Sequence, residues 1–114
     1  MAEILDSDIL LRRVNFLHPA NIKDDGSPSS MAFTPRKQDH DGLSVDVEKL
    51  TTIDDAIVDR QKYRLFALAA KIPREVDLEC VHDPLEGNSA HGLISGNFTR
   101  SKSRKLAKNA IRVG

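Results

Sequence analysis

The sequence contains one cysteine, few aromatic side chains and no long hydrophobic run. It has four Phe, one Tyr and no Trp among 114 residues. So few aromatic rings argue against a stacking platform for single-stranded nucleic acid. The lone Cys80 excludes an internal disulfide and a cysteine-based zinc site, and a reducing cytoplasm is its simplest setting.

No stretch has the composition of a membrane span or of a signal peptide. A membrane span needs roughly 20 apolar residues, and no run in this sequence approaches that length. The N-terminal stretch MAEILDSDILLRR places acids before its apolar residues, whereas a signal peptide begins with positive charge. We therefore expect a cytoplasmic protein that does not enter a membrane.

Common cofactor motifs are absent as well. The sequence has no G-x-x-x-x-G-K-[ST], G-x-G-x-x-G or H-E-x-x-H pattern. These patterns hold nucleoside triphosphates, dinucleotides and catalytic zinc, respectively. We therefore expect neither a cofactor nor a metal ion. Asp39, His40 and Asp41 could hold a divalent cation, but adjacent residues of an extended strand point to opposite sides, so only the two Asp would share a face. We therefore interpret this segment as a surface turn.

Length and composition favour one α+β domain over residues 1–114. A chain of this size, 39% hydrophobic and 30% charged, is typical of a globular unit with one modest core. Apolar patterns predict strands over residues 4–16, 31–34, 43–47, 63–70, 76–81 and 92–95. We expect the second and third of these strands to form a hairpin. A short helix remains an alternative for 3–12, and a buried helical segment for 63–70.

Two helices are predicted from their capping residues. Thr52 precedes IDDAIVDRQ, which has an acidic first turn and suits a helix of two to three turns. Thr99 caps a last helix over residues 100–112. The narrow apolar stripe by which this helix can dock on a sheet consists of Leu106, Ala110 and Val113. The order of elements predicts a small mixed or antiparallel sheet covered by two helices.

Positive charge is concentrated at the C-terminal end. Residues 97–114 contain six bases and no acid, whereas the other 96 residues contain eleven Lys and Arg against seventeen Asp and Glu. On the predicted helix the bases form one broad face, and they are Arg100, Lys102, Arg104, Lys105, Lys108 and Arg112. No carboxylate within the helix relieves their repulsion, and three lie in the first turns, where the helix dipole disfavours cations.

This basic face has three interpretations. Acidic residues elsewhere in the chain can pair with it, or water can solvate it. Phosphates of nucleic acid or another polyanion can bind it, held by the side chains and by free backbone N–H groups at the helix start. The third interpretation is that an acidic surface of a partner protein binds it. Clustered Lys and Arg alone do not distinguish these interpretations.

Two histidines bracket a polar loop. His82-Asp83 and His91 stand at the ends of HDPLEGNSAH, with Asn88 between them. If the loop folds back, these side chains form an acid–base pair with a polar stabiliser, which is a set suited to RNA cleavage beside a phosphate-binding face. The alternative is an ordinary turn in which each His only bonds to the backbone. Cys80, inside an alternating strand, is expected to be buried and inert.

Several segments of the chain resemble a group of small bacterial single-domain proteins. They are LLRRV, SSMAF, GLSVDV, HDPLEGNSAHGLISG and RKLAKNA, which give the pattern SSxAF…LSV…DPLxxNxAH. The resemblance spans most of the chain, and its most specific part is Asp83-Pro84-Leu85 with Asn88 and His91. It implies a bacterial, stand-alone domain and brings no assigned activity with it.

The sequence therefore predicts a small accessory or binding module. It docks on nucleic acid or on an acidic partner protein through Arg100, Arg104, Lys105 and Lys108. The first alternative is a small ribonuclease-like hydrolase that uses His91 and His82 as acid and base. The second is a structural subunit of a larger bacterial assembly, in which the separated charges set the orientation.

Overall fold

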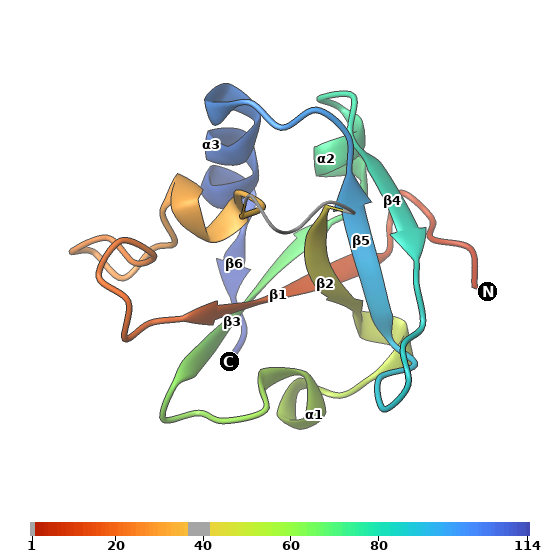
Figure 1. The fold of residues 1–114 in the computed structure, drawn as a ribbon, viewed down its shortest axis with the longest axis horizontal. Helices are drawn as coiled ribbons and strands as arrows, with labels where there is room; N and C mark the ends of the chain where they lie inside the picture. Colours follow the sequence, from red (N-terminus) through yellow and green to blue (C-terminus); the bar gives the residue numbers. More distant parts are fainter. Residues whose placement is uncertain (1, 37–41) are drawn as a thin grey trace.

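A computed structural model describes residues 2–36 and 42–114, which form one antiparallel sheet of six strands in the order β4-β5-β2-β1-β3-β6 (Figure 1). The strands are β1 (Ile9–Asn15), β2 (Leu43–Val47), β3 (Tyr63–Ala69), β4 (Glu79–His82), β5 (His91–Ser95) and β6 (Ile111–Arg112). The α-helices are α1 (Ile53–Ile57), α2 (Lys71–Arg74) and α3 (Arg100–Asn109). Two short 3₁₀ helices are η1 (Ser30–Phe33) and η2 (Glu48–Leu50). The predicted α+β class with an antiparallel sheet is confirmed.

One face of the sheet carries the main core. Side chains alternate between the faces of a strand, so every second residue of β1 and β3 points to this side. There Leu10 and Phe66 belong to one buried cluster with Phe33 of η1 and Leu106 of α3. Phe33 and Phe66 are at most 1% exposed. The burial of each ring contributes about 1.5–3 kcal/mol to the free energy of unfolding.

The opposite face is covered only in part. Leu11 of β1 and Leu65 of β3 are buried under Ala56 and Ile57, which come from α1. Figure 1 shows α1 on the side of the sheet away from α2 and α3. The strands β2 and β4 keep exposed side chains on this face, among them Ser44.

The predicted strand at residues 31–34 is wrong, and so is its hairpin with β2. Most of this segment belongs to η1. Side chains occupy the backbone oxygens that a strand would use: Arg12 Nε donates to the Ala32 carbonyl (2.9 Å) and Ser103 Oγ to the Phe33 carbonyl (3.1 Å). Because these bonds satisfy the backbone without a ladder, Ala32 and Phe33 can both enter the core.

The last helix ends at Asn109 rather than at Arg112. Ala110 has an extended backbone, with φ −81° and ψ 140°, and Ile111 and Arg112 then pair with β3 as β6. The open edge of β3 offers unpaired backbone groups, and β-branched Ile111 favours a strand. Arg112 and Val113 therefore do not belong to the helix face on which they were predicted.

The helical alternatives for residues 3–12 and 63–70 are wrong, because β1 and β3 pair along seven residues each. The first helix is shorter than predicted. Thr52 caps it by accepting from the Asp55 N–H, but the chain leaves it at Val58, whose φ is +67°. The strand predicted from residue 76 begins only at Glu79, because Asp77 has a positive φ of 63°. The helix α2 was not predicted.

Gly42, which immediately precedes β2, should not tolerate a side chain. Its φ is +128°, and a Cβ there would lie 2.4 Å from the Ile94 carbonyl oxygen of the neighbouring strand. Gly87 also has a positive φ, of +81°, but a Cβ there would meet no atom within 4 Å. We expect Gly42→Ala to lower the free energy of unfolding by at least about 3 kcal/mol. The matched Gly87→Ala should cost about 1 kcal/mol.

Urea unfolding followed by circular dichroism measures both losses. Equal losses for the two variants would contradict the close approach of Gly42 to β5.

Candidate functional site

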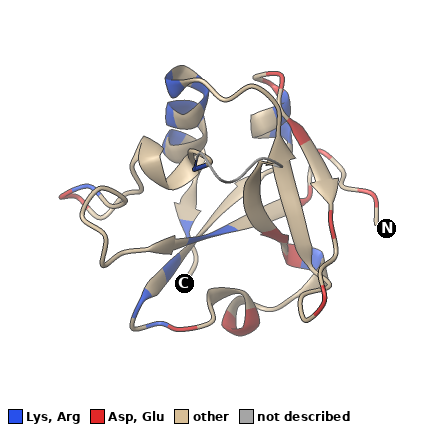
Figure 2. Cartoon of the chain, in the orientation of Figure 1, with Lys and Arg blue, Asp and Glu red and all other residues tan. Residues whose placement is uncertain are grey.

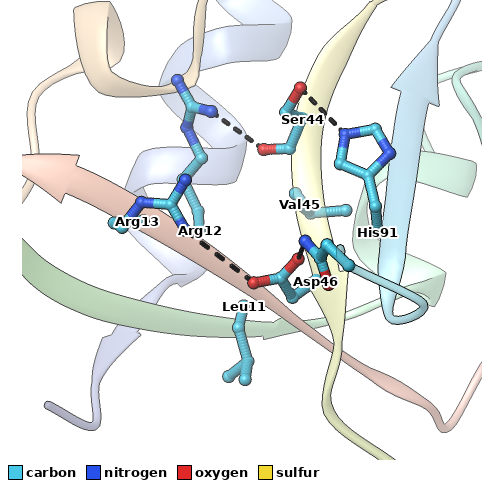
Figure 3. A pocket seen from close by; sticks show the side chains of 8 residues that line it. Leu11, Arg12, Arg13, Ser44, Val45, Asp46 and His91 are labelled. Carbon is cyan, nitrogen blue, oxygen red and sulfur yellow. Dashed lines mark hydrogen bonds and ion pairs between the residues drawn. The ribbon is translucent and has the colours of Figure 1, made fainter. Parts of the chain in front are cut away.

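A gap between β1 and β2 opens the middle of the partly covered face. The two strands pair only at Leu10–Val47 and Leu11–Asp46. Hollows with volumes of about 50, 450 and 650 Å³ meet here, and Arg13 lines all three. The smallest hollow also contains Ser44, Asp46, Asn88 and His91 in its wall. Most of these side chains are labelled in Figure 3.

Ser44, His91 and Asp83 form a chain of polar contacts at the smallest hollow. Ser44 Oγ lies 3.2 Å from His91 Nε2, as the dashed line in Figure 3 marks. His91 Nδ1 lies 2.9 Å from the Asp83 carbonyl oxygen and 3.3 Å from Asp83 Oδ2. The strand register explains the first contact. His91 stands opposite Asp46 across the β2–β5 ladder, so Ser44 is its diagonal neighbour on the same face.

The contacts of His91 fix which ring nitrogen carries its proton. A backbone carbonyl can only accept, so Nδ1 must hold the hydrogen that it shares with the Asp83 carbonyl oxygen. In the neutral ring Nε2 is then an acceptor, and the Ser44 hydroxyl donates to it. His91 is 9% exposed, whereas Ser44 is exposed. The pair therefore joins a shielded base to a hydroxyl that solvent and ligands can reach.

Asn88 holds the loop that carries this site against the sheet. Its Nδ2 donates to Asp46 Oδ1 (2.8 Å), and its Oδ1 accepts from the Ala90 N–H (3.2 Å). Asp46 is 6% exposed, and Arg13 Nη1 lies 3.9 Å from its other oxygen. The same Arg13 nitrogen donates to the Ala56 carbonyl, which ties β1 to α1. Asn88 and Asp46 thus have a positioning role beside His91.

The structure does not bring His82 to this cluster. His82 pairs with Gly92, the residue after His91, so the two histidine side chains lie on opposite faces of the sheet. The Ala2 N–H donates to His82 Nδ1 (2.8 Å), and Nε2 lies 2.7 Å from the Ser89 carbonyl oxygen. Both ring nitrogens therefore have backbone partners, and the geometry gives no support to acid–base catalysis by paired His82 and His91.

The basic residues of the C-terminal end divide into two groups. Lys105 lies 3.7 Å from Glu75, Lys102 donates to the Asn97 carbonyl, and Arg112 donates to the Gly114 carbonyl from its place in β6. The second group, hereafter the basic row, consists of Arg100, Arg104 and Lys108. Within residues 2–36 and 42–114 the side chains of the basic row make no hydrogen bond or ion pair. Figure 2 shows basic residues along α3.

The remaining predictions concern metal ligands, membrane spans and the triplet at residues 39–41. Across the described parts of the chain, no three His, Cys, Asp or Glu side chains are grouped as metal ligands. In those same parts, no helix combines the length and apolar character that crossing a membrane requires. The triplet from Asp39 to Asp41 lies outside the described residues.

Ser44, Asp46 and Arg13 were missed by sequence reasoning. The apolar and polar residues of Leu43–Val47 alternate, which predicts a strand with Ser44 and Asp46 on one face. Their approach to His91 depends on which strand lies beside β2, and no pattern in the sequence states that. The chain matches no family model, no curated protein and no solved structure. The geometry of the described side chains is therefore the basis for assigning a function.

Replacement of Asn88 should destabilise the protein through Asp46. In Asn88→Ala the nearly buried Asp46 carboxylate loses its amide donor, which costs about 1–3 kcal/mol of unfolding free energy. Asn97→Ala removes an exposed amide that makes no such contact and serves as the matched control. Chemical denaturation of the two variants compares them directly. A loss no larger than that of the control would show that Asn88 does not support Asp46.

Cys80 should react slowly in the native protein. It is 7% exposed, and burial raises the pKa of its thiol to about 11. Because the thiolate is the reactive form, we expect a disulfide reagent at pH 8 to label native Cys80 about 100-fold more slowly than the urea-unfolded chain. Comparable rates would contradict this burial.

The raised pKa of Cys80 also makes the stability of the protein depend on pH. Folding favours the neutral thiol, so its contribution is complete below the unfolded pKa of about 8.5 and is lost as pH rises toward the folded value of about 11.

Proposed function

We propose that this chain is a binding module that docks on double-stranded nucleic acid through the basic row of α3. The observation that carries the proposal is the exposure of Arg100, Arg104 and Lys108 together with their lack of a partner within the described residues. A cytoplasmic setting suits this role, because the single Cys80 needs no oxidising compartment.

The basic row is unfavourable for the helix alone. Its members follow one another at i+4, where like charges repel, and α3 has no acid in its first turn. The helix dipole adds to the repulsion at Arg100. Phosphate oxygens would relieve both the repulsion between the bases and the unfavourable interaction with the helix dipole. They would also accept hydrogen bonds from backbone N–H groups of the first turn, among which only that of Lys102 donates to Thr99 Oγ1.

The spacing of the row favours duplex nucleic acid over an acidic protein. Residues four apart are about 6 Å apart along a helix, so the row extends over about 12 Å. Duplex DNA presents one charge per roughly 1.7 Å of its axis, and therefore offers phosphates along the whole row. A protein surface must instead place individual carboxylates to match it. Contacts of this kind bind the backbone and carry no sequence information.

Titration of labelled duplex DNA and duplex RNA at several salt concentrations tests this proposal. Three phosphate contacts predict a log–log slope of about −2.7 on DNA. Arg104→Glu with Lys108→Glu leaves one contact, so this slope should flatten to about −0.9, and measurable binding at 200 mM salt should be abolished. The control pair Lys23→Glu with Arg60→Glu makes the same charge change elsewhere. In the described part of the chain Arg60 pairs only with exposed Asp54, so its loss should cost little stability.

Three outcomes would overturn the proposal. One is the absence of binding at 50 mM salt. Another is an equal loss of binding in the α3 variant and the control. The third is tighter binding of the α3 face to polyglutamate than to duplex, which would identify an acidic protein surface, as in a larger assembly, as the partner.

A further inference from the structure

We propose that Ser44 is a nucleophile activated by His91, and that the smallest hollow beside it accepts the acyl group of short-chain carboxylic esters. The site lies on the β2–β5 region of the sheet and does not involve α3. It is therefore independent of nucleic-acid binding.

The first support is the direction of the Ser44–His91 hydrogen bond. Because Nδ1 donates to the Asp83 carbonyl, Nε2 presents its lone pair to the Ser44 hydroxyl at 3.2 Å. This distance lies at the limit of the range over which a general base takes the proton of a nucleophile, and such contacts tighten when substrate binds. A histidine held in the other tautomer would donate to Ser44 and could not activate it.

The second support is the carboxylate on the far side of the ring. Asp83 Oδ2 lies 3.3 Å from Nδ1, so a negative charge faces the imidazolium that forms when His91 takes the serine proton. Asp83 acts through His91 and is a positioning residue. The order of nucleophile, base and acid along a chain differs between unrelated folds that share this geometry, so the geometry is the criterion.

The third support is positive charge at the same hollow. Arg12 Nη1 donates to the Ser44 carbonyl (2.8 Å), and Arg13 lines the hollow from the neighbouring position of β1. Figure 3 shows both guanidinium groups on the β1 side of Ser44, opposite His91. An oxyanion that develops on a substrate carbonyl at Ser44 would be stabilised by Arg13, which projects from the same face of the sheet as the Ser44 side chain.

The volume of the hollow selects the acyl group. It has a volume of about 50 Å³, more than tenfold smaller than the hollow of about 650 Å³ that also borders Ser44. We therefore place the smaller part of the substrate, a short acyl group, in the smaller hollow. The hollow of about 650 Å³, which shares Arg12, Arg13 and Ser44 with the smaller one, leaves room for the alcohol part.

The reaction proceeds in two balanced steps. As Ser44 Oγ bonds to the ester carbonyl carbon, its proton moves to His91 Nε2. The bond from that carbon to the alcohol oxygen then breaks, and the same proton leaves with the alcohol. Water next attacks the acyl carbon, gives one proton to His91 Nε2 and releases the carboxylic acid as the Ser44 oxygen recovers a proton from His91.

Labelling with an alkyl fluorophosphonate, followed by peptide mass spectrometry, tests the nucleophile directly. The probe bonds to an activated serine oxygen and releases fluoride. We expect one label on Ser44, none in Ser44→Ala, and wild-type labelling in Ser95→Ala, which removes another hydroxyl on the same face of β5. His91→Gln should label at least about 100-fold more slowly. The companion assay follows hydrolysis of p-nitrophenyl acetate and p-nitrophenyl octanoate, in which the acetate should be preferred.

A second variant protects the test against misfolding of His91→Gln. Asp83→Asn keeps the backbone carbonyl that fixes the tautomer, so only the facing charge is lost, and labelling should slow by up to about tenfold. Circular dichroism verifies the fold of each variant. The proposal is overturned by an unlabelled wild-type protein, by a label outside Ser44, or by a folded His91→Gln that labels at the wild-type rate. Equal hydrolysis of the two esters would overturn the assignment of a short acyl group.

Discussion

The early separation of β1 from β2 determines where the partly covered face of the sheet can bind a small molecule. β1 pairs with β3 along its whole length but with β2 at two positions only. A complete ladder between these two strands would close the gap that the hollows occupy. Here the separation leaves Arg12 and Arg13 at the opening, where Arg12 bridges the Ala32 and Ser44 carbonyls. The polar cluster on β2 and β5 borders an opening because β1 and β2 pair along only part of their length.

The two proposed sites depend on different kinds of interaction. The basic row of α3 depends on charge that has no partner among residues 2–36 and 42–114, so its interactions are exposed and salt-sensitive. The Ser44 site depends on shielded and directional hydrogen bonds, which salt hardly affects. Lys105 shows that the acidic part of the chain neutralises one base of α3, through Glu75. The internal pairing considered for the C-terminal end therefore accounts for Lys105 but not for the basic row.

Local patterns identified most strands but not their neighbours. Alternation in β2, apolar character in β3 and the caps Thr52 and Thr99 all correspond to the observed elements. The failures arise where tertiary contacts override local preference. Residues 31–33 belong to η1 because Arg12 and Ser103, which lie far away in sequence, bind its carbonyls. The same limit applies to the site: His91 and Asn88 were named, whereas Ser44 and Asp46 join them only through the β2–β5 pairing.

The hairpin of β4 and β5 carries both Asp83 and His91, and β4 is an outer strand of the sheet. Outer strands open more readily than central ones, without unfolding of the whole domain. Ser44 belongs to β2 and would stay with the central strands when this hairpin opens. The proposed site therefore has one part on a central strand and another part on a hairpin that can separate from the sheet. Amide hydrogens of β4 will exchange with solvent sooner than those of β1, and the polar chain at Ser44 will exist only while the hairpin is closed.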